Sequence, residues 1–234
     1  MAQPERFCMI AANQNRQVQS KEVLVLLLLY GLQVWNAEML RRAFGHGHTA
    51  AGSRSLAREI VVMFSDYVHP LAMLILAIWF LVMGAALAGR QRIPRWAFDG
   101  AGLWFSFRLL VEFLTINLLV FKSSLVAPSI LLGQIVVYLP YFILNWGWIF
   151  YRLDWVDNST TGLVVSLSDI QVERSISPFD YFHSSMTTLL NKGKPTISGV
   201  NRLGRIVVLI YLTMLLMLYT VALTRILQLT RAAF

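Results

Sequence analysis

Long apolar runs separated by short polar links restrict this chain more than any other feature of its sequence. The four clearest runs cover residues 70–89, 100–121, 129–151 and 203–231. A helix of about 20 apolar residues crosses the hydrocarbon core of a bilayer. A helix also satisfies its own backbone hydrogen bonds there, which lipid cannot do. We therefore expect an all-α, polytopic bundle of transmembrane helices, that is, a multi-pass integral membrane protein.

A further apolar run near the N-terminus makes the number of spans four or five. Residues 23–35 are apolar but shorter than the roughly 20 residues that a span needs. If the helix continues through Asn36 and Glu38 to Leu40, it is long enough to cross. Otherwise it lies in the membrane interface. Both interpretations stay open at this stage.

Composition agrees with a membrane protein and excludes several other classes. Hydrophobic residues make up 57% of the chain and charged residues 14%, whereas soluble domains carry about 25% charged residues. The net charge is +8, but the Lys and Arg residues flank apolar runs, where they anchor helices and set topology. We expect the lipid bilayer, not nucleic acid, as the partner. The single cysteine, Cys8, permits no intrachain disulfide. We find no catalytic motif and expect neither an enzyme nor a cofactor.

The chain divides into three parts. Residues 1–67 hold the polar N-terminus, the short first run and an amphipathic connector with helical spacing of its apolar residues. Residues 68–127 form a two-span hairpin. Residues 128–234 contain an outer helix, a short helix and a long terminal helix. The third part carries the most information about function.

A short helix and a glycine-containing loop lie between the last two spans. Residues 178–190 are too short and too polar to cross a membrane, and residues 191–202 are rich in Gly, Pro and Lys. This order is typical of a re-entrant segment. Such a segment is tolerated at membrane depth only where protein or a water-filled cavity surrounds it. We therefore expect a re-entrant half-helix beside a pore or cavity.

The stretch from Pro178 to Arg205 resembles the pore loop of the potassium-channel superfamily. The matching residues are an aromatic group, a Thr-Thr pair and a Leu-Gly-Arg sequence: Phe179, Tyr181, Phe182, Thr187, Thr188, Leu203, Gly204 and Arg205. The resemblance implies a homotetramer with inorganic ions in its pore. It places at the constriction Thr187, Thr188, Leu190, Asn191, Lys192 and Gly193. It places on the inner helix, facing the vestibule, Thr213, Tyr219 and Thr220.

The selectivity filter of that family is degenerate in this chain. Its Gly-aromatic-Gly sequence is replaced by Asn191, Lys192 and Gly193. A potassium filter uses rings of backbone carbonyls, and the missing first glycine removes the conformational freedom that they need. A ring of Lys192 side chains would also repel cations. We predict the pore-forming subunit of an ion channel that is not potassium-selective. The alternative is a non-conducting scaffold subunit of a larger membrane complex, bound to other membrane subunits.

Charge distribution leaves the orientation unresolved. In the channel arrangement the link at residues 90–95 lies outside, on the same side as the acidic segment at 152–177. The positive-inside rule places this basic link in the cytoplasm instead.

Arg108 and Glu112 are charged residues inside an apolar run. Their spacing of four places them on one helix face, where they can pair. Intramembrane charges face protein or water, so the pair is either a gating or ion-path element or a structural salt bridge. His46 and His48 lack the spacing of a metal site, and we expect solvated histidines and no metal.

Overall fold

The computed structural model describes most of the apolar part of the chain. The described residues are 20–39, 68–89, 93–121, 128–157, 165–167, 178–190 and 197–233. The amphipathic connector, His46 and His48 therefore lie outside the described residues. The same holds for Asn191, Lys192 and Gly193.

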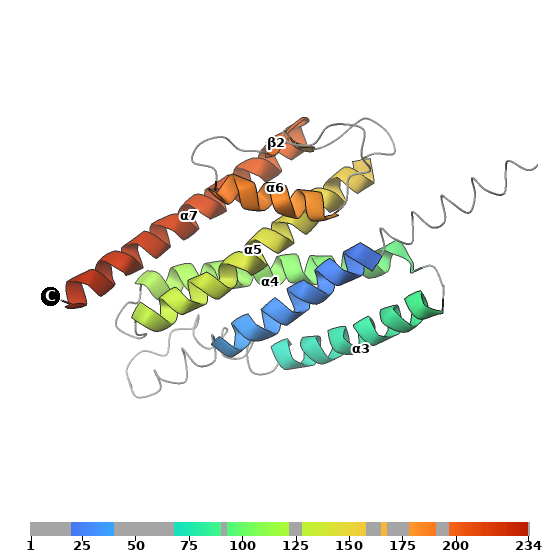
Figure 1. The fold of residues 1–234 in the computed structure, drawn as a ribbon, viewed down its shortest axis with the longest axis horizontal. Helices are drawn as coiled ribbons and strands as arrows, with labels where there is room; N and C mark the ends of the chain where they lie inside the picture. The colour runs from blue at the N-terminus through green and yellow to red at the C-terminus, as the bar shows by residue number, and fades with distance from the viewer. Residues whose placement is uncertain are drawn as a thin grey trace, which may run out of the picture.

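The described part of the chain is helical apart from two short strands (Figure 1). The helices are Ser20–Met39, α3 (His69–Ala88), α4 (Arg95–Phe121), α5 (Pro128–Asp157), α6 (Pro178–Leu190) and α7 (Arg202–Ala233). Strands β1 (Val165–Leu167) and β2 (Ile197–Gly199) pair antiparallel, with Ser166 opposite Ser198. The all-α class expected from the sequence is confirmed. The strand pair was not predicted.

Among the described residues, three helices are long and apolar enough to cross a membrane: Ser20–Met39, His69–Ala88 and Arg202–Thr224. The N-terminal run is thus part of a full-length helix that continues past Trp35 and Glu38. Pro70 lies in the first turn of α3, where its fixed φ angle and missing N–H cost nothing.

Two helices are longer than the sequence indicated. α4 begins at Arg95, although its apolar run begins near residue 100. α5 continues to Asp157, so the first six residues of the acidic segment at 152–177 belong to this helix, whereas the apolar run in the sequence ends at residue 151. Asp154 suggested solvent, but it is buried in α5 and accepts a hydrogen bond from the Tyr181 hydroxyl.

Side-chain contacts fix the helix directions. The Ser20–Met39 helix runs parallel to α4, because Arg95 Nη1 lies 2.9 Å from Glu22 Oε2 near one end and Asn36 contacts Glu112 farther along. α4 and α5 are antiparallel, since the Arg152 guanidinium donates to the Asp99 carboxylate at 2.7 Å and the Tyr141 hydroxyl donates to the Phe105 carbonyl at 2.8 Å.

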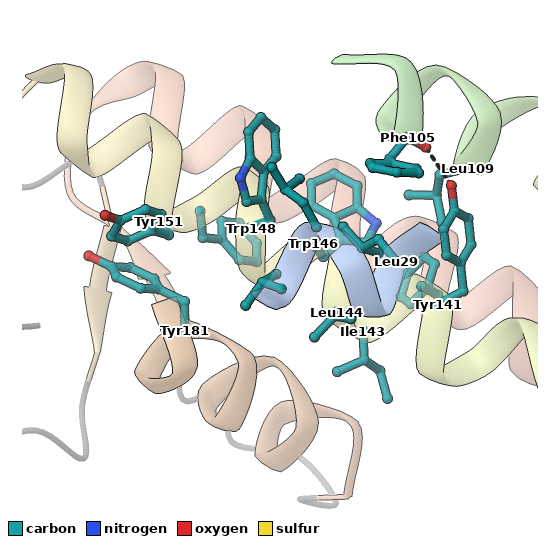
Figure 2. Packing of buried hydrophobic residues seen from close by; sticks show 14 of the residues in the cluster. Leu29, Phe105, Leu109, Tyr141, Ile143, Leu144, Trp146, Trp148, Tyr151 and Tyr181 are labelled. Atoms are coloured by element: carbon teal, nitrogen blue, oxygen red, sulfur yellow. Dashed lines mark hydrogen bonds between the residues drawn. The ribbon is translucent and has the colours of Figure 1, made fainter. Parts of the chain in front are cut away.

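α5 is the central helix of the bundle (Figure 1). One of its faces carries Tyr141 and Trp148 toward α4, and Figure 2 shows the Tyr141 hydroxyl reaching the Phe105 backbone. Another face packs against Tyr211 of α7, whose ring stacks on Phe142 with 5.6 Å between centroids. The aromatic core therefore ties α4, α5 and α7 together.

Candidate functional site

The short helix α6 is held by α5 at its beginning. The Tyr181 hydroxyl donates to the Asp154 carboxylate, and the Tyr181 ring lies 5.9 Å from the Tyr151 ring (Figure 2). Burial, together with this hydrogen bond, raises the pKa of the Tyr181 phenol above its ordinary value. The phenol therefore stays a hydrogen-bond donor, as the buried Asp154 carboxylate requires.

A glycine lets α6 approach α5 closely. A Cβ atom at Gly147 would lie 2.9 Å from the Phe182 Cα. A backbone atom cannot rotate away, so a side chain at this position would push the two helices apart. Gly147 therefore sets the depth at which α6 is seated.

α7 holds the second half of α6. The Tyr211 hydroxyl donates to the Ser185 carbonyl at 2.9 Å, and the Tyr219 hydroxyl donates to the Leu189 carbonyl at 2.6 Å. At about 1.5 Å per residue, Tyr219 lies roughly 25 Å along α7 from Arg202. The last turn of α6 therefore lies beside the middle of α7, far from the end where α7 begins (Figure 1).

The chain returns from α6 to the beginning of α7 through β2. Ile197 is buried, and a Cβ atom at Gly199 would lie 2.2 Å from the Arg205 nitrogen. Asn201 accepts a hydrogen bond from the Gly204 N–H at 2.7 Å, which satisfies one of the free amides in the first turn of α7. These contacts fix β2 against α7, and β2 in turn pairs with β1.

The threonine pair that the resemblance assigns to a constriction lies in the last two turns of α6. The Thr187 and Thr188 hydroxyls both donate to the Ser184 carbonyl, at 3.1 Å and 2.8 Å. Thr188 is buried, whereas Leu190 is 64% exposed at the end of the helix. Both hydroxyls thus donate their protons within α6.

The polar positions predicted for the inner helix lie on exposed surface. The Thr213 and Thr220 hydroxyls donate to the Leu209 and Leu216 carbonyls of their own helix. Tyr219 is 47% exposed although its hydroxyl is bonded to α6.

Arg108 and Glu112 form a buried ion pair within α4. Arg108 Nη2 lies 3.0 Å from Glu112 Oε1, and Glu112 is only 1% exposed. The second carboxylate oxygen of Glu112 accepts a hydrogen bond from Asn36 Nδ2 of the Ser20–Met39 helix. The pairing that the spacing suggested is present, with a partner from another helix that the sequence did not indicate.

Two glutamines lie at the same depth as this ion pair. Gln33 precedes Asn36 by one turn, which places it level with Arg108 in the parallel register. Tyr138 donates to the Leu109 carbonyl at 2.9 Å, so Gln134, one turn earlier on antiparallel α5, is level with Glu112. Both glutamines are fully buried. We call these residues the polar layer: Gln33, Asn36, Arg108, Glu112 and Gln134.

A buried histidine, His69, lies at the beginning of α3. Across the described ranges, no group of three or more His, Cys, Asp or Glu side chains is arranged to hold a metal ion.

Comparison with known proteins adds no family to these observations. No protein-family model, curated protein or solved structure matches the chain.

Proposed function

We propose that this chain crosses the membrane five times and forms an oligomeric pore from its C-terminal part. The Ser20–Met39 helix is parallel to α4, and α5 is antiparallel to α4. These directions agree with successive spans that alternate in direction. Three of these helices are apolar enough to span. An alternating five-helix chain would have its two ends on opposite sides of the membrane.

The position of α6 is the observation that carries the proposal. α6 enters the bundle beside the end of α5, at Tyr181, and ends beside the middle of α7, at Tyr219. In this proposal α7 spans the bilayer, so the end of α6 beside its middle lies at membrane depth. Such a helix end requires neighbouring protein or water. Further copies of the chain around a central axis would supply both.

The chemistry at the end of α6 suits inorganic ions without potassium selectivity. The Thr187 and Thr188 hydroxyls lie in the last two turns of α6, and Lys192 follows two residues after Leu190. In a homotetramer, four Lys192 charges near one axis oppose the passage of cations. Thr213 and Thr220 are exposed on α7 and in this proposal line the inner vestibule.

The first experiment is the mass of the assembly in nanodiscs. The proposal expects a homotetramer, and planar-bilayer recordings of that assembly should show currents. Lys192→Ala should change the ratio of anion to cation permeability, whereas Lys192→Arg, which keeps the charge, should leave it unchanged. A chain that purifies as a monomer contradicts the proposal.

A scaffold subunit is the second candidate. The face of α6 that carries His183, Met186 and Leu190 is exposed in the single chain, and a different membrane protein would cover it as well as another copy would. The same mass measurement separates the two candidates. A stable complex with a different membrane protein, without currents, favours the scaffold.

A further inference from the structure

The polar layer contains more hydrogen-bonding groups than the protein satisfies. Among the described residues, neither amide atom of Gln33 nor of Gln134 has a hydrogen-bond partner, and both side chains are 0% exposed. The buried Asn36 Oδ1 atom also has no hydrogen-bond partner among the described residues. A buried polar group without a partner costs about 1–3 kcal/mol. Water bound in a polar interior site removes this cost.

Glu112 is the carboxylate of the polar layer. Arg108 from its own helix and Asn36 from the Ser20–Met39 helix contact its two carboxylate oxygens. α5 contributes Tyr138, whose hydroxyl is committed to the Leu109 carbonyl, and α3 contributes His69, which lies within electrostatic range of Arg108. In the described residues the only carboxylate of the layer is therefore Glu112, balanced by one guanidinium.

We propose that Glu112 is a reversible proton-binding site that water in the polar layer supplies. A hydronium ion would give its proton to Glu112 Oε2. One O–H bond of the hydronium breaks, a new O–H bond forms on the carboxyl group, and a neutral water remains. Protonation removes the negative charge that faces the Arg108 guanidinium. This site is separate from the pore proposal and does not depend on it.

Asn36 has a hydrogen-bonding group for each protonation state of Glu112. In the structure its Nδ2 donates to the carboxylate. After protonation, a half-turn of the amide would present Oδ1, which accepts a hydrogen bond from the new O–H group. A permanently ionised pair needs only the donor. The unsatisfied Oδ1 therefore fits a carboxyl group that changes its charge.

Infrared difference spectroscopy of the full chain in nanodiscs tests this site directly. Between about pH 9 and about pH 5, above the usual titration of exposed Glu near 4.3, we expect the carbonyl band of a buried carboxylic acid to appear. The band should shift in D2O, because water exchanges its proton. Glu112→Gln should lose the band. Glu38→Gln should keep it, because Glu38 is exposed on the same helix as Asn36.

Glu112→Gln removes the carboxylate that pairs with Arg108, and this variant could fail to fold. A second variant keeps the test decisive in that case. The double variant Gln33→Leu, Gln134→Leu retains the ion pair and removes the amides that bind water. Its carboxylic acid band should lose the D2O shift on the time scale at which the native chain exchanges. Circular dichroism and size exclusion establish that it is folded.

Two results would overturn the proposal. The first is a native chain with no titrating carboxylic acid band, which would mean that Arg108 and Glu112 are a permanent structural pair. The second is a folded double variant whose band exchanges as fast as that of the native chain, which would mean that the glutamines do not supply water.

Discussion

The backbone of Gly147 on α5 lies against the backbone of Phe182 on α6, and a single added carbon would reach within 2.9 Å of the Phe182 Cα. This contact between two helices depends on the absence of a side chain. It is therefore the point at which the position of α6 is most easily changed by mutation.

Gly147→Ala should destabilise the chain even though alanine is the better helix former. Overpacking typically costs about 1–3 kcal/mol, against about 1 kcal/mol gained from helix propensity. The matched control is Gly133→Ala on the same helix, where an added Cβ meets nothing within 4 Å, so its stability should stay equal or rise. Equilibrium unfolding in mixed micelles measures both. Equal stabilities for the two variants would show that α6 is not seated against Gly147.

Arg108→Met should be among the most damaging single changes in α4. It leaves the buried Glu112 carboxylate without its counter-charge, and breaking a buried pair costs about 3–5 kcal/mol. The double variant Arg108→Met, Glu112→Met should recover most of this loss because no charge remains buried. Additive losses in the unfolding free energies would refute the coupling. Asp99→Asn is the control, since its partly exposed pair with Arg152 contributes about 1 kcal/mol or less.

Tyr219→Phe should loosen the end of α6 without disturbing its beginning. The variant removes the hydrogen bond to the Leu189 carbonyl, which is worth about 1 kcal/mol. Hydrogen–deuterium exchange should accelerate in the last turn of α6. Thr213→Val should leave that exchange unchanged, because the Thr213 hydroxyl bonds only within α7. If α6 exchanges equally fast in both variants, the bond does not hold the helix end.

The helix directions predict which residues react with an impermeant maleimide from each side of the membrane. In a Cys8→Ser background, Trp96→Cys and Arg202→Cys should be labelled from the same side, because α4 and α7 begin at the same end of the bundle. Thr230→Cys, near the other end of α7, should be labelled from the opposite side. Labelling of positions 202 and 230 from one side would contradict a membrane-spanning α7.

Local signals predicted the helices better than their ends. α6 has the expected bounds, because Pro178 suits a first helical turn and the sequence turns polar directly after Leu190. The apolar pattern places the beginning of α4 and the end of α5 too far inward. Asp99 and Arg152 lie near these two helix ends and pair with each other across the helices. Apolar periodicity cannot reveal a charge whose partner is 53 residues away.

Only the Arg108–Glu112 pair of the polar layer could be predicted from the sequence. The spacing of Arg108 and Glu112 on one helix indicated a pair, but Asn36 lies 76 residues from its partner. One signal was available: Gln33 and Asn36 are three residues apart at the end of the apolar run, so they share a helix face. The β1–β2 pair could not be predicted from the sequence, because three-residue strands are too short to show an alternation of apolar and polar residues.

The hydrogen bonds of Tyr211 and Tyr219 to α6 also determine the order in which the chain can be completed during biosynthesis. α6 is synthesised before either tyrosine, so it packs first against α5. The carbonyls of Ser185 and Leu189 gain their partners once the middle of α7 has left the ribosome. The packing of α6 is therefore completed late, and a chain truncated before Tyr211 would lack both of these hydrogen bonds to α6.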